Sequence, residues 1–335
     1  MKLYFAPMEG ITGYVYRNAH NRWFGGIDKY FTPFIVPGKN RNFRSRDLND
    51  VKPEHNRGVS VVPQILTNDS EDFLHTAGIL KDYGYEEINL NLGCPSGTVV
   101  SKGRGAGFLA DPDQLERFFD QIFEKADVKI SVKTRIGVED RAEWERLLEI
   151  YSHFPLEELI IHPRVRKDFY KNQPDPEAFR KAEERAPFPV CYNGDLFTVE
   201  EVTDFSECFP GADRVMLGRG LVADPGLART VKGEAMLDNR TLAGFHHEIL
   251  EGYRELLSGD RNVLFKMKEL WTYMIHLFPD NESYGKKIRK AQSLPEYNAW
   301  VEKLLTERDI ILHTGGYKSL HSETQYKTGR PGHGE

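Results

Sequence analysis

The 335-residue sequence has few cysteines and no long apolar segment. Its three cysteines form no CxxC pair and share no zinc-finger spacing with histidine, so neither a disulfide scaffold nor a structural metal is expected. No apolar run reaches the roughly 18 residues of a membrane-spanning helix. The start, "MKLYFAPMEG", lacks the long apolar region of a signal peptide. We therefore expect a cytoplasmic protein without a membrane partner.

The sequence also lacks an excess of positive charge. Its formal net charge is −6, which argues against a protein that coats nucleic acid over its whole surface. Two basic stretches nevertheless stand out, "GKNRNFRSR" at 38–46 and "GKKIRK" at 285–290. Local positive patches on an acidic body can steer an anionic partner. Ordinary solvated faces are the other interpretation.

Short runs rich in Val, Ile, Leu and aromatic residues recur before about residue 240. Several are continuously apolar, which is typical of parallel strands buried on both faces. Helical patterns lie between them, for example at 69–84 and 111–126, and each of these begins with an Asp that can cap a helix. The eight candidate strands span 2–8, 27–36, 59–66, 86–93, 128–136, 156–164, 187–195 and 212–220.

Eight β/α units over about 240 residues predict an α/β fold, a (β/α)8 TIM barrel. A doubly wound sheet is disfavoured, because the first strand is followed by "MEGITGY" and not by a GxGxxG motif. Three amphipathic helical patterns follow, at 241–257, 262–278 and 294–312. We predict a barrel domain over 1–240, a small all-helical C-terminal domain over 241–312 and a disordered tail over 313–335.

Polar residues gather at the carboxyl ends of the predicted strands, where active sites of such barrels form. Burying so many polar groups without a partner is costly, although any one of them alone would suit a satisfied core position. An anionic, heterocyclic ligand would satisfy them together. In strand order they are Gln64; Asn89, Asn91 and Cys94; Lys133 and Arg135; His162 and Arg164; Asn193, Gly194 and Asp195; and Gly218 and Arg219.

The last two predicted strands end in glycine-containing turns, "YNGD" at 192–195 and "LGRG" at 217–220. Barrels often bind phosphate there through backbone N–H groups. Arg219 could add a bidentate contact, and Lys133 could stabilise negative charge on a reduced ring. Two ordinary strand-to-helix turns are the alternative.

The motifs "YFAPMEGIT", "NLNLGCPS", "SVKTRIG", "IIHPR", "YNGD" and "MLGRG" together resemble those of the tRNA-dihydrouridine synthase family, over about residues 1–312. The resemblance implies an FMN-containing barrel enzyme that uses NADPH to reduce the uracil 5,6 double bond of selected uridines in tRNA. It also implies that the helical C-terminal domain binds tRNA. One departure is Gly13, where many family members have Asp.

The resemblance implies roles for individual residues. Cys94 would be the catalytic acid that protonates carbon 5 of the uracil, opposite the hydride delivered to carbon 6. The substrate uracil would contact Asn91, Arg135 and Arg164. FMN would contact Ala6, Pro7, Met8, Gln64, Lys133, His162, Asn193, Gly194, Asp195, Gly218 and Arg219. A positive tRNA surface would comprise Lys286, Lys287, Arg289 and Lys290, with Lys39, Arg41, Arg44, Lys102 and Arg104.

As an acid, Cys94 should be a thiol, so no nearby cation need lower its pKa. Cys94 as a core residue is the alternative, and it is our interpretation of Cys191 and Cys208. The loop "GRGAG" at 103–107 is interpreted as a flexible segment. Two other functions stay open: an FMN-barrel oxidoreductase of a free pyrimidine, similar to dihydroorotate dehydrogenase, and a non-catalytic tRNA-binding protein.

Overall fold

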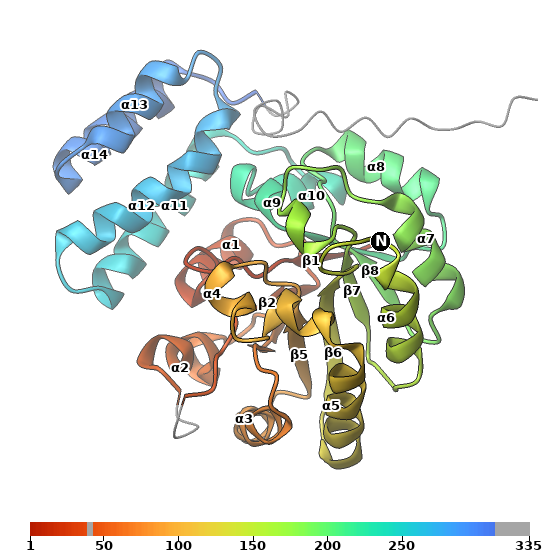
Figure 1. Cartoon of the computed structure of the whole chain (residues 1–335). Coiled ribbons are helices and arrows are strands. Elements are labelled where there is room, and N and C mark those ends of the chain that lie inside the picture. Colours follow the sequence, from red (N-terminus) through yellow and green to blue (C-terminus); the bar gives the residue numbers. More distant parts are fainter. Residues whose placement is uncertain (39–42, 312–335) are drawn as a thin grey trace, which may run out of the picture.

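The computed structural model describes residues 1–38 and 43–311. Lys39, Arg41 and the tail predicted at 313–335 lie outside the described residues. A ring of parallel strands forms the centre of the molecule, with helices around it (Figure 1). The strands are β1 (Lys2–Phe5), β2 (Lys29–Phe31), β3 (Val61–Val62), β4 (Gln64–Ile65), β5 (Glu87–Leu92), β6 (Lys129–Arg135), β7 (Leu159–His162), β8 (Val190–Tyr192) and β9 (Arg214–Leu217).

The strand order β3-β2-β1-β9-β8-β7-β6-β5-β4 describes a barrel of eight positions. β3 pairs with β2 and β4 pairs with β5, so these two short strands are halves of the third predicted strand. Pro63 lies between them, and because proline has no N–H it cannot continue the hydrogen-bond ladder. The predicted TIM barrel is confirmed, with this interruption added.

Helices alternate with the strands around the barrel, and a second group follows it. The predicted helices near 69–84 and 111–126 are confirmed, and Asp69 and Asp111 cap them by accepting hydrogen bonds from Asp72 N and Gln114 N. The barrel helices are α1 (Tyr14–Trp23), α2 (Ser45–Val51), α3 (Ser70–Asp82), α4 (Gly97–Val100), α5 (Pro112–Lys125), α6 (Glu143–Ser152), α7 (Pro176–Arg185), α8 (Val199–Cys208), α9 (Arg219–Ala223) and α10 (Leu227–Val231). The short 3-10 segments are Pro53–His55, Gly105–Ala110, Arg166–Asp168 and Ile275–Leu277.

The C-terminal helices contain one element that the sequence patterns did not predict. Beside the three expected helices, the basic stretch forms a fourth in which Tyr284 and Ile288 are buried. The helices are α11 (Asn239–Leu256), α12 (Asp260–Met274), α13 (Glu282–Lys290) and α14 (Leu294–Glu307). All four lie together on one side of the barrel (Figure 1). None of the helices in the described part of the chain is long and apolar enough to cross a membrane.

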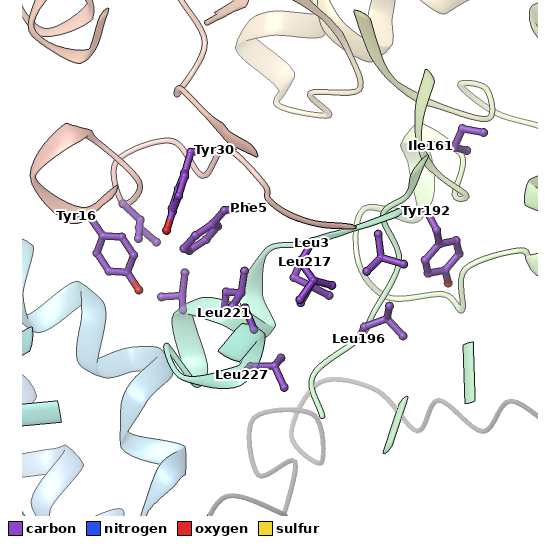
Figure 2. Close-up of a cluster of buried hydrophobic side chains, with 14 of the residues drawn as sticks. Leu3, Phe5, Tyr16, Tyr30, Ile161, Tyr192, Leu196, Leu217, Leu221 and Leu227 are labelled. Carbon is purple, nitrogen blue, oxygen red and sulfur yellow. The ribbon is translucent and has the colours of Figure 1, made fainter. Parts of the chain in front are cut away.

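Alternation along the strands separates two apolar layers. Leu3 and Phe5 of β1 point outward and pack with helix residues such as Tyr16 and Leu221 (Figure 2). Tyr4 of β1 points inward, in a cluster with Phe31 and other strand residues. The outer layer attaches the helices to the barrel, and the inner layer fills it.

Charged residues occupy the amino-terminal end of the barrel. Glu158 is fully buried, and its carboxylate binds Lys29 Nζ at 2.9 Å and Arg214 Nη1 at 3.1 Å. Tyr4 donates to the same carboxylate at 3.0 Å, and Lys29 also pairs with Glu87 at 2.6 Å. The charges at this end of the barrel are therefore paired with one another. The opposite end is the one where a ligand could be bound.

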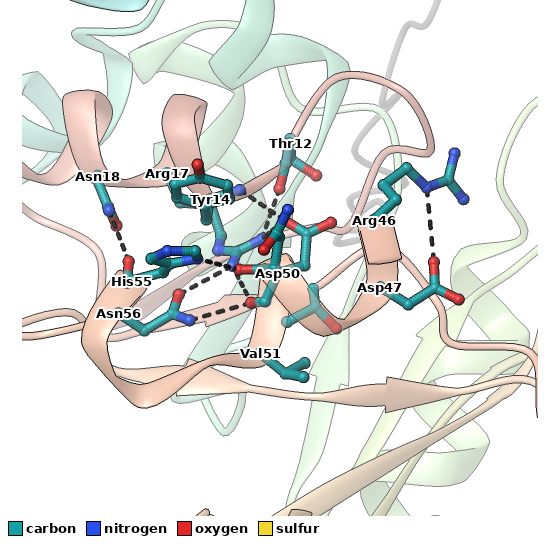
Figure 3. A network of polar contacts seen from close by, with 12 residues as sticks. Thr12, Tyr14, Arg17, Asn18, Arg46, Asp47, Asp50, Val51, His55 and Asn56 are labelled. Carbon is teal, nitrogen blue, oxygen red and sulfur yellow. Dashed lines mark hydrogen bonds and ion pairs between the residues drawn. The ribbon is translucent and has the colours of Figure 1, made fainter. Parts of the chain in front are cut away.

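A polar network holds the loop between β1 and α1 (Figure 3). Arg17, 1% exposed, donates to the carbonyls of Thr12 at 2.8 Å and Asp50 at 2.7 Å. Asp50 accepts from Tyr14 N at 2.6 Å, next to Gly13, which has no side chain to cap α1. A carboxylate from α2 therefore supplies the cap, and Thr12 in turn accepts from Met8 N at 2.8 Å.

Two glycines allow α11 to approach α1. A Cβ at Gly244 would lie 2.1 Å from the Trp23 ring, and one at Gly252 would lie 2.7 Å from Val15. Trp23 Nε1 donates to Glu248 of α11 at 2.8 Å. The contact has no room for a methyl group, so α11 packs closely against α1 and joins the C-terminal helices to the barrel.

We predict that Gly244→Ala lowers the free energy of unfolding by about 1–3 kcal/mol, because the added methyl group forces Trp23 to move. Urea unfolding followed by circular dichroism would measure it. Gly78→Ala is the matched control, since Gly78 is an exposed position of α3 with no atom near its missing Cβ. That substitution should raise stability by about 0.5–1 kcal/mol. Equal effects of the two substitutions would contradict the packing argument.

Candidate active site

Cys94 lies on the loop that follows β5, and a side chain of β5 holds that loop. Asn91 Oδ1 accepts hydrogen bonds from Gly93 N at 3.1 Å and Cys94 N at 2.9 Å. Arg135 Nε donates to the Gly93 carbonyl at 3.0 Å from the neighbouring strand. These three hydrogen bonds fix the backbone directly before the cysteine side chain. Asn91 and Arg135 thus position Cys94, whatever else they contact.

The glycine-rich segment at 103–107 packs closely against the Cys94 loop. Gly105 has a φ of +55°, and a Cβ there would lie 2.9 Å from the Cys94 carbonyl oxygen. A Cβ at Gly107 would lie 2.7 Å from the Val100 carbonyl oxygen. Ala106 N donates to the Cys94 carbonyl at 3.1 Å. The glycines therefore allow this segment to pack closely against the backbone of residues 94–100. The interpretation of the segment as a flexible loop is replaced by one of tight packing.

The Cys94 thiol is half-buried, and its pKa is raised above that of an ordinary cysteine. Burial is the main cause, because the thiolate loses hydration in the barrel mouth. A backbone hydrogen bond near Ser96 and the charges of Arg135 and Lys133 act in the opposite direction but do not outweigh it. At neutral pH Cys94 is therefore a protonated thiol, the form that can donate a proton.

An amide chain crosses the mouth from β4 to β6. Gln64 Nε2 donates to Asn89 Oδ1 at 2.7 Å, and Asn89 Nδ2 donates to Ser131 Oγ at 2.9 Å. Asn91 Nδ2 donates to Gln64 Oε1 at 2.7 Å. Each amide N–H₂ has a second hydrogen, so Gln64 keeps one donor beyond this chain. The chain fixes which way each amide points.

Three arginines surround Asp195 and the loop after β7. Arg164, which is fully buried, binds Asp195 through both terminal nitrogens, at 3.1 and 2.5 Å. Arg219 Nη2 binds the same carboxylate at 2.6 Å. Arg135, 1% exposed, donates to the carbonyls of Val165 at 3.1 Å and Phe169 at 3.0 Å. The mouth thus has more positive than negative charge.

Lys133 and His162 retain donors that no neighbour takes. Within residues 1–38 and 43–311, no hydrogen bond or ion pair reaches the Lys133 ammonium. Burial, followed by repulsion from Arg135, lowers the pKa of Lys133 to about 8. His162 Nε2 lies 2.9 Å from Arg164 Nη1, which can only donate, so Nε2 accepts and Nδ1 carries the hydrogen.

The electrostatics of the mouth keep His162 neutral. Burial is the largest cause that lowers the pKa of His162, and the charges of Arg135, Arg164, Lys133 and Arg219 lower it further. Neutral His162 therefore has one N–H, and among the described residues nothing accepts it. The Lys133 ammonium and this N–H suit a ligand rich in acceptors.

The ends of β1, β8 and β9 lie around the same mouth. Ala6 is part of the inner cluster, and a Cβ at Gly218 would approach Ala6 at 3.4 Å and the Met8 sulfur at 4.0 Å. Asn193 Nδ2 donates to the Met216 carbonyl at 2.7 Å. Pro7 and Gly194 flank these positions in the chain. The barrel thus brings to one end the strand-end residues that the sequence singled out.

The exposed cations are distributed over separate elements. Lys286, Lys287, Arg289 and Lys290 are all exposed on α13, and Lys287 lies 5.2 Å from the Trp300 ring. Arg44 pairs with Asp47 at 2.8 Å, next to α2. Arg104 Nε donates to Asn68 at 3.2 Å, and Lys102 is exposed. α13 and α2 lie at well-separated places in Figure 1, so the basic residues form more than one patch.

Sequence reasoning missed three parts of the site. One is Tyr170, which lies beside His162 with the ring centroids 5.8 Å apart. The sequence "DFYKN" could have indicated it, because two aromatic residues stand there among polar ones. Ser131 and Gly105 gave no such indication. In the part of the chain that the structure describes, no group of three His, Cys, Asp or Glu side chains could hold a metal.

The barrel with convergent strand ends is a fold shared with a reductase and a dehydrogenase of known structure. Morphinone reductase in complex with tetrahydroNAD matches with a TM-score of 0.50 and 12% identity, over 73% of this chain and 92% of that one. Histamine dehydrogenase from Rhizobium sp. 4-9 matches with a TM-score of 0.51 and 13% identity, over 74% of this chain and 49% of that one. At such identities the likeness shows the fold alone.

Sequence comparison identifies the family. The family model described as dihydrouridine synthase (Dus) matches residues 4–308. The tRNA-dihydrouridine(16) synthase of Aquipseudomonas alcaligenes is 29% identical over 241 residues, 69% of this chain and 75% of that protein. The tRNA-dihydrouridine synthase B of Pasteurella multocida is 25% identical, over 69% of each chain. The chain belongs to the dihydrouridine synthase family and is a flavin-dependent oxidoreductase of that family.

The raised pKa of Cys94 predicts the pH dependence of its alkylation. Iodoacetamide reacts with the thiolate, so the reaction rate at Cys94 should be low at pH 7 and should rise with an inflection above the pKa of an ordinary cysteine. Mass spectrometry of the labelled peptide over a pH series would measure it, with a cysteine-containing model peptide as reference. An inflection below that of the reference would contradict the assignment of Cys94 as a thiol.

Proposed function

We propose that this chain, as a tRNA-dihydrouridine synthase, reduces the uracil 5,6 double bond of specific uridines in tRNA, with Cys94 as the proton donor. The proposal rests on the protonated, half-buried thiol at the mouth of a barrel that also holds unused donors. Membership of the family supports the reaction class. The residue roles are those that the family resemblance implies, and the unused donors at the mouth support them.

FMN with NADPH as its reductant is the proposed redox pair, and the residues at the mouth fit a flavin. The Lys133 ammonium and the His162 N–H have no acceptor among the described residues, and the isoalloxazine is a planar ring system rich in acceptors. Bound FMN, once reduced, would supply the hydride for carbon 6 of the uracil. Lys133 would stabilise negative charge on the reduced ring.

The remaining proposed cofactor residues lie at the ends of the adjacent strands. Ala6, Pro7 and Met8 after β1 would face the ring, with the free amide hydrogen of Gln64 as a further donor. The phosphate and ribityl chain would lie near the ends of β8 and β9. Asn193, Gly194, Asp195, Gly218 and Arg219 are there, and Asp195 already pairs with Arg219. Asp195 would therefore orient Arg219 toward the phosphate.

Cys94 would transfer its proton to carbon 5 of the uracil as the carbon 6 bond to hydrogen forms. The thiol becomes a thiolate in this step, and solvent then restores the proton. Asn91 and Arg135 both hold the peptide group between Gly93 and Cys94, and Arg164 fixes the neighbouring Asp195 and His162. We propose that the same three side chains lie next to the bound uracil, as polar walls of its pocket.

The C-terminal helices are proposed to be a tRNA-binding domain from about residue 241. The four exposed cations of α13 support this, because phosphate contacts supply much of the affinity of nucleic-acid complexes. A uridine must leave its stack to reach a barrel mouth, as other base-modifying enzymes require. The helices fixed on α1 would hold the tRNA body while the base enters.

Cys94→Ala should lower the rate of dihydrouridine formation by about 10²–10⁴-fold, the usual contribution of a general acid. The substrate would be tRNA from cells that lack the gene, with dihydrouridine measured by mass spectrometry. Flavin absorbance and NADPH oxidation should persist, because the thiol is not needed for either.

Cys208→Ala is the matched control, since Cys208 is also half-buried but lies at the end of α8. It should retain the wild-type rate. A wild-type rate with Cys94→Ala would refute the acid role. Reduction of free uracil or orotate, with none of tRNA, would instead favour an oxidoreductase of free pyrimidines.

Replacing Lys286, Lys287, Arg289 and Lys290 with Gln should weaken tRNA binding and flatten its dependence on salt. Each phosphate contact that is lost should reduce the slope of log affinity against log salt by about 0.9. Electrophoretic mobility shifts over a salt series would measure both. The control replaces Lys81, Arg117, Lys125 and Lys129, which are exposed on the α3–α5 side of the barrel. Equal losses from the two quadruple variants would indicate a general charge effect.

A further inference from the structure

The loop after β7 exposes two adjacent aromatic side chains at the barrel mouth. Phe169 is 41% exposed and Tyr170 is 46% exposed, although both are large rings. They follow the 3-10 segment Arg166–Asp168, directly after the strand that ends in His162. Single exposed aromatic residues are common. This pair therefore needs an explanation only if other residues of the protein hold it in place.

Two buried arginines hold this loop by its backbone. Arg135 donates to the carbonyls of Val165 and Phe169, and Arg164 donates through Nε to the Asn172 carbonyl at 2.5 Å. Both guanidinium groups lie almost completely out of solvent, where an unpaired charge is costly. Three backbone carbonyls of this loop thus accept hydrogen bonds from buried guanidinium groups. The loop is a fixed part of the site.

The backbone at Phe169 adopts a conformation that bulky residues avoid. Its φ is +49° and its ψ is −99°. Such a conformation costs free energy and persists only where the surroundings impose it. Arg135 imposes it here through the Phe169 carbonyl. The result is that the next residue, Tyr170, projects at the mouth.

Tyr170 keeps 46% of its surface exposed, although two guanidinium groups and the His162 ring lie around its ring. The Arg219 guanidinium carbon lies 4.7 Å from the ring centroid, and that of Arg135 lies 5.5 Å away. The His162 ring lies 5.8 Å away. Cation–π contacts with two arginines fix the ring. Tyr170 is therefore a partly exposed aromatic side chain, held by its neighbours beside the residues proposed to bind flavin and uracil.

We propose that Tyr170 stacks an unpaired nucleobase next to the reacting uridine, and so positions the tRNA strand at the mouth. This inference rests on the proposed function. A nucleobase matches the site because base–aromatic stacking uses the open face of a ring, while the neighbouring arginines attract the phosphates on either side of the base. Tyr170 is a positioning residue and takes no part in proton transfer.

The experiment measures the affinity of the flavin-loaded, full-length protein for two dye-labelled pentanucleotides by fluorescence anisotropy. One is five uridines, and the other has a single central uridine with abasic neighbours. The wild type should bind the first about tenfold more tightly, in the range expected for stacking on an aromatic side chain. Tyr170→Ala should lose most of that preference, and Tyr170→Phe should keep it.

Phe265→Ala is the matched control. Phe265 is 59% exposed on α12, with the Arg261 guanidinium 5.7 Å from its ring, but it is not on the loop after β7. Its removal should leave the preference between the two pentanucleotides unchanged. A preference lost equally in Phe265→Ala would overturn the assignment to Tyr170.

The other outcomes also decide the question. A full preference in Tyr170→Ala would overturn the proposal, and a loss in Tyr170→Phe would assign the effect to the hydroxyl group and not to stacking. Loss of flavin absorbance in Tyr170→Ala would place the ring in the cofactor site, against the proposal. Wild-type protein that shows the preference but forms no dihydrouridine in tRNA would refute the proposed function alone.

Discussion

The guanidinium group of Arg135 connects the parts of the candidate site. From β6 it donates to Gly93 beside the cysteine, and to Val165 and Phe169 in the loop after β7. One buried side chain thereby holds two loops that are more than 70 residues apart in the sequence. A lysine at this position would have one nitrogen and could not reach all three carbonyls in that arrangement. Arg135 therefore links the loop of Cys94 directly to the loop of Tyr170, while Asn91 and Arg164 each hold one of the two.

The two ends of the barrel differ in how completely their charged side chains are paired. At the amino-terminal end, Glu158 and Glu87 neutralise Lys29 and Arg214. At the other end Asp195 pairs with two arginines, and no carboxylate among the described residues pairs with Lys133. Burial, and then repulsion from Arg135, lowers the pKa of Lys133. A chain with a net charge of −6 thus has a positive mouth, where an electron-rich ring and a polyanion would both be favoured.

The fold was predictable because apolar runs and capping residues are local properties. All eight predicted strands form, because each is rich in apolar or aromatic side chains that become buried, including Tyr30 and Phe31 in β2. The role of a residue at the site depends on the direction in which its side chain points. The spacing of residues in the sequence does not reveal that direction. The sequence indicated that Asn91, Arg135 and Arg164 lie at strand ends. It did not indicate that they would form hydrogen bonds with backbone carbonyls and amides of nearby loops. Glycines 105 and 107 were interpreted as part of a flexible loop, and only the atoms opposite them show that they permit close packing.

The contact of α1 with Gly244 and Gly252 has a consequence for how one uridine is chosen among many. Under the tRNA binding proposed above, the packing of α11 on α1 would set the span between the bound tRNA body and Cys94. The uridine that reaches Cys94 would then be the one at the matching distance from the part of the tRNA that the helices contact. Changing the selected uridine would require moving that contact along the helices, with the barrel residues unchanged.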